Sequence, residues 1–286
     1  MRVSLKQLLP TALRSGYAVA AFNVTNLETA QAAVSAAVEQ RSPVILAISE
    51  SAAKYGGRAL FAAVCALADD VPIPAVVHLD HHIDLPLIKQ GLDWGATSVM
   101  FDGSHLPLLE NITQTKGIVR LAHRRRVSVE GEIGMIGGQE DGSGAGIQLA
   151  VIKDAVQFTG QTRVDAIALG LGTSHGLPVA HETIHISILE QYYLHARTPV
   201  VLHGASNLPP SMIRAGIRHG VAKINIDTQL RQAFTAAVKR TLTKDEKLIN
   251  VRDYIGQGRD SMRQEAMKIL KMFGSVNEAH ALRHNR

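Results

Sequence analysis

The sequence lacks several features that would assign it to particular classes of protein. It has a single cysteine, Cys65, which excludes an intramolecular disulfide framework and fits a reducing cytoplasm. No apolar run approaches the length of a membrane span, and the N-terminal stretch is too broken by polar residues for a signal peptide. We therefore expect a soluble, cytoplasmic protein with no membrane partner.

Aromatic residues are also scarce, and this affects how the positive charge is interpreted. Phe, Trp and Tyr make up 4% of the chain, too few for a base-stacking platform, although the net charge is +5. The only tight basic cluster, Arg124 to Arg126, follows a predicted helix, where cations offset the helix dipole. The sequence predicts no nucleic-acid partner, because an anionic small substrate makes use of the same charge.

Eight short apolar runs alternate with helix-length segments along the chain. A strand buried on both faces has this composition, and such strands form parallel sheets. Eight of them predict an α/β fold, a closed (β/α)8 TIM barrel, and 286 residues suit one domain spanning residues 1–286. The runs are Tyr17–Asn23, Pro43–Ser49, Pro74–His81, Ser98–Ser104, Val127–Glu132, Asp165–His175, Pro199–Ser206 and Val221–Thr228.

Helices are expected between these runs, because apolar residues there recur three and four positions apart. The expected helices are Leu27–Gln40, Leu85–Trp94, Glu110–His123, Ile147–Phe158, His185–His195 and Pro210–His219. Two extra C-terminal helices, Leu230–Leu242 and Gly258–Phe273, follow the eighth run. The polar stretch Thr243–Gln257 between them is predicted to be a surface loop.

One stretch breaks the alternation. Gly134–Gly146, directly after the fifth run, contains six glycines in thirteen residues. Such a segment is too flexible to pack as a core element, so it is either a mobile active-site loop or a surface excursion. Glu140 and Asp141 at its centre favour the active-site interpretation, because a mobile loop can carry a carboxylate to a substrate.

Three histidines stand at equivalent positions. His81, His175 and His203 follow the third, sixth and seventh runs, and the carboxyl ends of barrel strands meet at one face. Three imidazoles with one open position are typical of a catalytic Zn²⁺ site. His78 shares the strand parity of Asp80, so it is expected to point inward, lower in the barrel.

Carboxylates form a second group at the same rim. Asp80 precedes the first of these histidines, Asp102 ends the fourth run, and Glu130 and Glu132 alternate at the end of the fifth. Alternation places Glu130 and Glu132 on the same side of their strand. Carboxylates beside a dication coordinate it, orient its ligands or transfer protons. The pattern predicts an acid–base site with room for a second metal position.

The last two runs end in small and hydroxyl-bearing residues, within His203–Ser206 and Asn225–Thr228. In TIM barrels the loops after strands seven and eight commonly hold a phosphate. Ser and Thr hydroxyls beside glycine-opened backbone amides suit that anion. The sequence therefore predicts a phosphorylated small molecule as the ligand.

At this point the chain closely resembles the class II, zinc-dependent ketose-bisphosphate aldolases. The matching stretches follow one another over nearly the whole chain: AFNVTNLET, PVILAISE, VHLDHH, SVMFDGSHLPLLENITQTK, VSVEGEIGMIGGQEDG, LGTSHG, VLHGAS, GVAKINIDTQLRQAF and YIGQGRDSM. The resemblance implies reversible cleavage of fructose 1,6-bisphosphate or tagatose 1,6-bisphosphate to dihydroxyacetone phosphate and glyceraldehyde 3-phosphate.

The resemblance also implies roles for the polar residues at the rim. His81, His175 and His203 would bind the catalytic Zn²⁺, and Asp102 and Glu132 match an alternative, more buried metal position. Backbone oxygens around the positions from His175 to Gly204 would bind a monovalent cation, Na⁺ or K⁺.

Further roles implied by the resemblance concern the substrate. Asp80 would exchange the proton of the C4 hydroxyl, and Glu140 would move the proton at the enediolate carbon. Arg259 resembles the arginine that reaches a neighbouring subunit's distal phosphate, which implies a homodimer or homotetramer. The substrate pocket would be formed by Ser49, Gly176, Gly204, Ala205, Ser206, Asn225, Asp227 and Thr228.

Lysine placement separates the metal mechanism from a Schiff-base mechanism. A Schiff-base aldolase needs a lysine, commonly on a central barrel strand, and the sixth run contains none. Lys223 in the eighth run has inward parity but sits well below the rim, so we interpret it as structural.

Several features leave the substrate open. The segment Leu177–His185 departs from the lysine-containing turn usual in the family, which favours another phosphorylated ketose or a keto-sugar acid as an alternative. The LDHH doublet resembles tagatose-bisphosphate aldolases, whereas the aspartate of NIDT resembles fructose-type enzymes. The remaining alternative is a non-catalytic sugar-phosphate-binding subunit, against which stand the intact histidines, Asp80 and Glu140.

Overall fold

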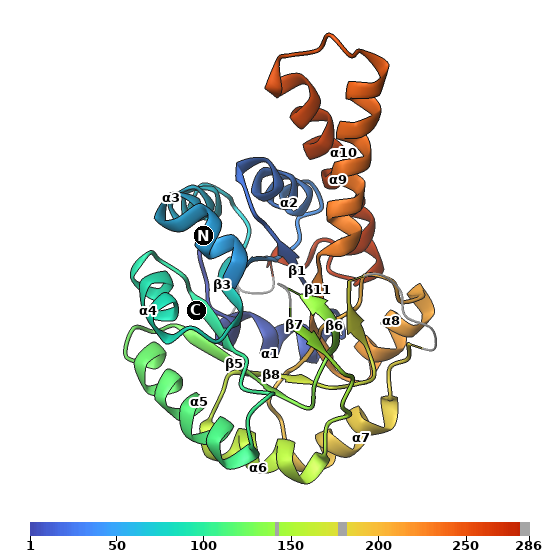
Figure 1. Ribbon diagram of the computed structural model, residues 1–286. Coiled ribbons are helices and arrows are strands. Elements are labelled where there is room, and N and C mark those ends of the chain that lie inside the picture. The colour runs from blue at the N-terminus through green and yellow to red at the C-terminus, as the bar shows by residue number, and fades with distance from the viewer. Residues whose placement is uncertain (141–142, 177–181, 281–286) are drawn as a thin grey trace.

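The computed structural model describes residues 1–140, 143–176 and 182–280, and of residues 139, 140, 143–145 and 280 only the backbone. Eight parallel strands close into a barrel, in the order β1, β2, β3, β4, β5, β8, β10, β11 and back to β1. Helices surround the barrel (Figure 1). The strands are β1 (Val19–Asn23), β2 (Val44–Ser49), β3 (Ala75–His82), β4 (Ser98–Phe101), β5 (Ser128–Ile133), β8 (Ala166–Leu169), β10 (Val200–Leu202) and β11 (Val221–Ile226).

Each of the eight predicted runs supplies one barrel strand, so the predicted TIM barrel is confirmed. Residues of both parities are buried in these strands, because one side faces the barrel interior and the other faces the helices. The surrounding helices are α1 (Leu5–Ser15), α2 (Leu27–Glu39), α3 (Glu50–Asp69), α4 (Leu85–Asp93), α5 (Leu108–His123), α6 (Ile152–Thr162), α7 (Ile186–His195) and α8 (Pro210–Arg218).

Three of these helices differ from the expectation, and one of them is α3, since the expected helices include none over Glu50–Asp69. The helix expected from Ile147 begins only at Ile152, because the backbone of Gln148 is already hydrogen-bonded to that of Met135. Helix α1 is not among the predicted helices. It contacts β5, β8 and β11, buries Leu5, Leu8 and Leu9, and the backbone N–H of Leu5 donates to the Oγ of Ser128 on β5.

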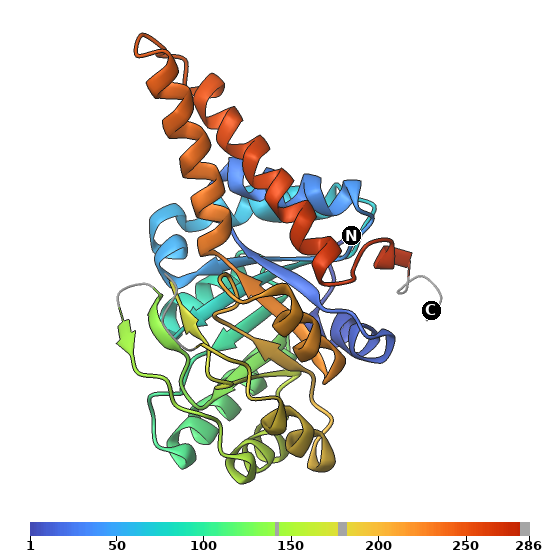
Figure 2. The same ribbon diagram turned by 90° about the vertical axis from the view of Figure 1, so that its right-hand side faces the viewer.

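The two extra C-terminal helices, α9 (Thr228–Lys244) and α10 (Val251–Met272), form a hairpin that projects from the barrel (Figures 1 and 2). The surface loop predicted over Thr243–Gln257 is wrong in its second half, because α10 already begins at Val251. The Asn250 side chain accepts a hydrogen bond from the N–H of Arg252 and caps that helix. A short 3₁₀-helix, η1 (Glu278–His280), follows α10.

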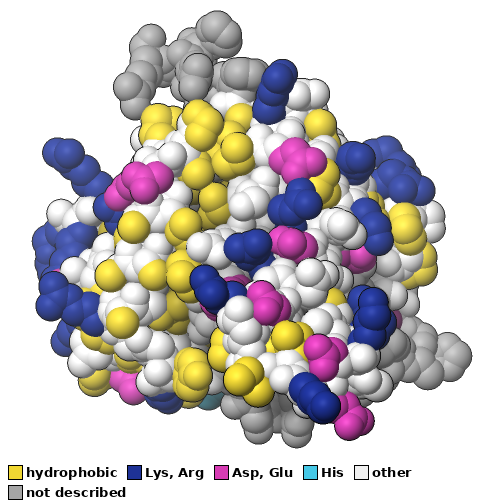
Figure 3. Space-filling model, turned by 90° about the horizontal axis from the view of Figure 1, so that it is seen from above, with side chains coloured by type: hydrophobic (Ala, Val, Ile, Leu, Met, Phe, Trp, Pro, Cys, Tyr) yellow, Lys and Arg dark blue, Asp and Glu magenta, His cyan; other side chains and the backbone are white. Residues whose placement is uncertain are grey.

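The surface agrees with the charge pattern of the sequence. Seen from above, Lys and Arg side chains are spread over the face with Asp and Glu side chains among them (Figure 3). Within the described residues, no helix combines the length and apolar character needed to cross a membrane.

The glycine-rich stretch is more ordered than expected. β6 (Gly137–Glu140) pairs antiparallel with β7 (Ser143–Ala145) and parallel with β9 (Ser174–His175), forming a small separate sheet. Gly138 has a φ of 87°, and a Cβ there would collide with the carbonyl oxygen of His175. The segment thus contains regular strands, and glycine at position 138 permits the close backbone approach between β6 and β9. Asp141 lies outside the described residues.

Candidate active site

Strand β3 supplies two consecutive site residues because its pairing with β4 is irregular. Leu79 pairs with Val99 and His82 pairs with Phe101, so Asp80 and His81 together lie opposite a single residue. This is a β-bulge, and His81 there has a φ of 50°. Neighbouring residues of a regular strand point to opposite faces, whereas the bulge directs both of these side chains into the site.

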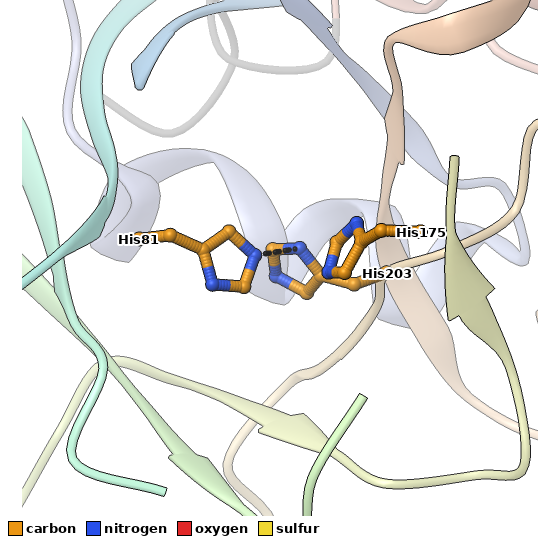
Figure 4. A group of neighbouring side chains, drawn as sticks. All are labelled: His81, His175 and His203. Atoms are coloured by element: carbon orange, nitrogen blue, oxygen red, sulfur yellow. Dashed lines mark hydrogen bonds between the residues drawn. The ribbon is translucent and has the colours of Figure 1, made fainter. Parts of the chain in front are cut away.

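The structure brings the three histidines together. His81 comes from β3, His175 from β9 and His203 from the end of β10, and their rings converge (Figure 4). One nitrogen from each ring can be chosen so that all three lie within 4.8 Å of one another. Nε2 of His81 and Nδ1 of His203 are 2.8 Å apart.

The chemistry of this donor set fits a cation. Nδ1 of His81 is 2.9 Å from Oδ2 of Asp102, and Nε2 of His203 is 3.0 Å from Oε1 of Glu130. An ionised carboxylate only accepts hydrogen bonds, so these two outer ring nitrogens carry the protons. The inner nitrogens of His81 and His203 then present lone pairs to each other. Such a pair needs a shared proton or a metal ion between them, and carboxylate–histidine pairs are the usual support of a metal ligand.

A second group of possible ligands lies beside the first. His81, Asp102 and Glu132 can place ligand atoms within 4.8 Å of one another. Burial and the nearby Asp102 charge raise the pKa of Glu132 well above its ordinary value. Burial would also raise the pKa of Asp102, but hydrogen bonds from His81 and Ser104 hold it below the ordinary value.

Asp80 is fully buried and surrounded by donors. Nδ2 of Asn23 donates to its Oδ2 at 3.0 Å, and Nδ2 of Asn225 lies 3.0 and 3.1 Å from its two oxygens. Burial alone would raise the pKa of Asp80, yet the neighbouring His78 and the charges of His81 and Lys223 hold it well below its usual range. Asp80 is therefore held in its ionised form. Asn23 is absent from the predicted site, although its place at the end of the first run could have indicated it.

A cavity of about 580 Å³ reaches the candidate metal site at His175, which is one of its lining residues. The N-terminus of α9, which offers free backbone N–H groups, opens onto it at Thr228. Gly204 has a φ of 65°, and a Cβ there would collide with the Ser174 backbone, so glycine is required. Most of the predicted substrate residues line this cavity: Gly176, Gly204, Ala205, Ser206, Asn225, Asp227 and Thr228.

The cavity continues along α9 beyond the predicted residues. Arg231, Thr235 and Lys239 line this extension, and Nε of Arg231 is 2.6 Å from Oδ1 of Asp227. Residues four apart share one face of a helix, so the spacing from Asp227 through Arg231 to Lys239 could have revealed this face. The extension therefore places two positively charged side chains, Arg231 and Lys239, beyond the end of the cavity that is lined by small and hydroxyl-bearing residues.

The other predicted residues lie elsewhere or are only partly described. Ser49 pairs with Asp80 in the β2–β3 register and is buried at the start of α3. Nη1 of Arg259, on α10, lies 3.5 Å from Oε1 of Gln31. This arginine lines a separate cavity of about 550 Å³. Glu140 belongs to β6, but its side chain lies outside the described residues.

Comparisons with known proteins agree with this architecture. The family model "Fructose-bisphosphate aldolase class-II" matches residues 3–278. A fructose-bisphosphate aldolase of Geobacillus stearothermophilus is 39% identical over 282 residues, covering 97% of this chain and 98% of the relative. A 6-phospho-5-dehydro-2-deoxy-D-gluconate aldolase of Shouchella clausii is 37% identical over 281 residues, covering 97% of this chain and 96% of the relative.

Solved structures show the same likeness. The crystal structure of the YdjI aldolase from Escherichia coli K12 matches with a TM-score of 0.87 and 27% identity, covering 98% of this chain and 100% of that one. The family match and the named relatives make this protein an aldolase, an enzyme that breaks and forms carbon–carbon bonds. The chain belongs to the class II fructose-bisphosphate aldolase family.

Proposed function

We propose that this enzyme is a zinc-dependent ketose-bisphosphate aldolase. It cleaves fructose 1,6-bisphosphate or tagatose 1,6-bisphosphate reversibly between C3 and C4, giving dihydroxyacetone phosphate and glyceraldehyde 3-phosphate. The observation that carries the proposal is the meeting of three histidine nitrogens within 4.8 Å at a site that also holds a buried, ionised aspartate. The 39% identical fructose-bisphosphate aldolase supports it.

The proposed zinc ligands are His81, His175 and His203, with Asp102 and Glu132 as an alternative position. When bound, zinc supplies Lewis-acid stabilisation of the negative charge that develops on the substrate oxygens. Backbone oxygens between His175 and Gly204 are the proposed site of a monovalent cation, Na⁺ or K⁺.

The proton transfers are assigned to two carboxylates. Asp80 accepts the proton of the C4 hydroxyl as the C3–C4 bond breaks, and the C4 carbon becomes the aldehyde. The amides of Asn23 and Asn225 hold the Asp80 carboxylate in place for this step. Glu140 then delivers a proton to C3 of the enediolate, which completes dihydroxyacetone phosphate. In the condensation direction each residue carries out the reverse transfer.

The phosphate of dihydroxyacetone phosphate is proposed to bind where the cavity is lined by Gly204, Ser206 and the first turn of α9 at Thr228. Asp227 is the proposed contact to the sugar hydroxyls, with Ser49 nearby. Arg259 is proposed to serve the active site of a second copy, in a homodimer or homotetramer. We place this activity in the cytoplasm and assign it to residues 1–286 acting as one domain.

Three observations concern the choice of substrate. Nε2 of His82, the second histidine of the LDHH doublet, is bonded to the carbonyl oxygen of Ile48 on β2, so a direct role for its ring in choosing the C4 epimer is not supported. A phosphorylated keto-sugar acid is the second candidate, and the 37% identical 6-phospho-5-dehydro-2-deoxy-D-gluconate aldolase favours it. The altered segment that starts at Leu177 motivates the same alternative.

The test is a coupled assay with fructose 1,6-bisphosphate, tagatose 1,6-bisphosphate and 6-phospho-5-dehydro-2-deoxy-D-gluconate, each with and without a chelator. Chelator-sensitive cleavage of either bisphosphate supports the proposal, and the ratio of the two rates gives the preference at C4. Cleavage of the sugar acid alone favours the second candidate. If zinc-loaded protein cleaves none of them, a different phosphorylated ketose is the next candidate substrate, and after it comes the non-catalytic sugar-phosphate-binding subunit.

A further inference from the structure

A buried cation that the proposed reaction does not use lies beneath the histidines. Lys223 on β11 is fully buried inside the barrel. Its Nζ donates to Oε2 of Glu130 at 2.7 Å and lies 3.3 Å from Nε2 of His78. An ammonium group removed from water is costly unless it is paired and hydrogen-bonded, so these contacts define where Lys223 can sit.

Glu130 connects this lysine to the metal site. Its side chain is also fully buried, and its second oxygen, Oε1, accepts a hydrogen bond from Nε2 of His203 at 3.0 Å. Each carboxylate oxygen thus has its own partner, Lys223 on one side and His203 on the other. This chain of contacts crosses the barrel interior from β11 through β5 to the end of β10.

The His203 ring has two nitrogens with different surroundings. Nε2 faces the Glu130 carboxylate, which only accepts hydrogen bonds and therefore keeps the proton on that nitrogen. Nδ1 faces Nε2 of His81 at 2.8 Å, in the group of three histidines. The unprotonated Nδ1 of His203 is therefore directed into the candidate metal site while Glu130 holds the proton on Nε2.

His78 closes the other side of the lysine. Nε2 of His78 lies 3.3 Å from the lysine Nζ, and its Nδ1 lies 2.9 Å from Oγ of Ser98. The same ring lies 3.6 Å from Oδ1 of Asp80 and 3.7 Å from Oε2 of Glu130. Lys223 therefore has two fully buried side-chain neighbours, Glu130 and His78.

We propose that Lys223, acting through Glu130, is a positioning residue that fixes the tautomer and orientation of His203 for metal binding. The pair lies outside both groups of candidate ligands, so Lys223 acts on the site only through another side chain. Outer partners of metal-binding histidines typically contribute roughly 10–100-fold to metal affinity. The proposal rests on the proposed metal role of the histidines, and the experiment separates the two.

The experiment measures zinc affinity by chelator competition in the wild type, Lys223→Met, Glu130→Gln and the double variant. We expect each single variant to bind zinc roughly 10–100-fold more weakly. The double variant should bind as weakly as Glu130→Gln alone, because the lysine acts through that carboxylate. Lys6→Met, a solvent-exposed change at the start of α1, is the matched control and should leave the affinity unchanged.

A second readout uses the zinc-free protein, with ¹⁵N NMR of labelled histidine rings. His203 should be protonated at Nε2 in the wild type and should populate both tautomers in Lys223→Met. If Lys223→Met does not fold, Glu130→Gln and the double variant still test the proposal, since the double removes both buried charges. A further loss of zinc affinity in the double beyond that of Glu130→Gln would overturn it.

The outcomes separate the two proposals. Wild-type protein that binds zinc, together with a Lys223→Met variant of equal affinity and unchanged tautomer, overturns the positioning role and leaves the aldolase proposal standing. Wild-type protein that does not bind zinc overturns the metal role of the histidines. In that case, a His203 tautomer that is the same in the wild type and in Lys223→Met overturns the positioning role as well.

Discussion

Nδ2 of Asn225 lies 3.0 and 3.1 Å from the two carboxylate oxygens of Asp80, joining β11 to β3 inside the barrel mouth. With Asn23 donating at 3.0 Å, the carboxylate is held by two neutral amides. Amide donors stabilise the ionised carboxylate and fix its orientation, so the Asp80 carboxylate remains a proton acceptor directed at the site.

Asp80→Asn should retain zinc and lose cleavage. The change keeps the volume of the side chain but removes the proton acceptor, so kcat should fall roughly 10²–10⁴-fold, the usual contribution of one acid–base group. The coupled cleavage assay and the metal content of the purified variant are measured together. Loss of zinc alongside activity would show that Asp80 supports the metal site and would remove its acid–base role.

Glu140→Gln should slow proton exchange at C3 of dihydroxyacetone phosphate and leave the fold intact. Its carboxylate is proposed to move that proton, and an amide cannot. Exchange is followed by NMR in deuterated water, and folding by circular dichroism. Asp141→Asn, the neighbouring carboxylate, is the matched control. An exchange rate equal to the wild type in Glu140→Gln would take Glu140 out of the mechanism.

Gly138→Ala should detach the glycine-rich hairpin from β9. Gly138 has a φ of 87°, and a Cβ there would collide with the carbonyl of His175, so the β6–β9 pairing cannot persist. We expect faster amide exchange in β6 and weaker zinc binding, because His175 loses its neighbouring strand. Gly146→Ala has open space around the new methyl group and should behave as the wild type. Equal protection of β6 in both variants would contradict the pairing.

In zinc-free protein, Glu132→Gln should be more stable than the wild type near neutral pH. Burial and Asp102 raise the pKa of Glu132, so its contribution to stability is complete below the ordinary value of 4.5 and is lost as pH rises through the folded-state pKa. Glutamine does not titrate and avoids that loss. Urea unfolding with a chelator, near pH 4.5 and near neutrality, tests this. A stability difference that does not change with pH would argue against a raised pKa.

Removing zinc should lower the free energy of unfolding. A ligand present at 1,000 times its Kd stabilises the folded state by about 4 kcal/mol, provided that it does not bind the unfolded chain. Thermal unfolding is compared with and without a zinc chelator, and His203→Ala is measured in parallel. The chelator should have little effect on that variant, because its zinc site is incomplete. An equal drop in both proteins would mean that the chelator acts elsewhere.

The barrel was predictable from the sequence because a strand buried on both sides appears as a short continuous run of apolar residues. The run that gives β11 is an example. The three histidines could be grouped for the same reason, since strand ends meet at one face. The contacts of His81 with Asp102 and of His203 with Glu130 depend on side-chain directions at β3 and β4 and at β10 and β5, which alternation alone does not give.

Other features depend on contacts between distant residues. The β6–β7 hairpin forms because β9, more than thirty residues further along the chain, offers a backbone edge to Gly138. Helix α10 starts at Val251 despite polar neighbours, because Asn250 caps it and α2 and α9 pack against it. The composition of a segment gives its glycine content and its polarity. Neither property identifies the distant strand or helix that stabilises the segment in the fold.

The β3 bulge makes the proposed acid–base group and a proposed zinc ligand covalent neighbours. A single trans peptide unit joins Asp80 to His81, so their α-carbons stay about 3.8 Å apart whatever the surrounding loops do. Most pairs of active-site residues are aligned by tertiary packing, which mutation elsewhere can loosen. Here bond lengths and angles set that spacing, so substitutions in the outer shell can change what the enzyme accepts while these two residues remain neighbours.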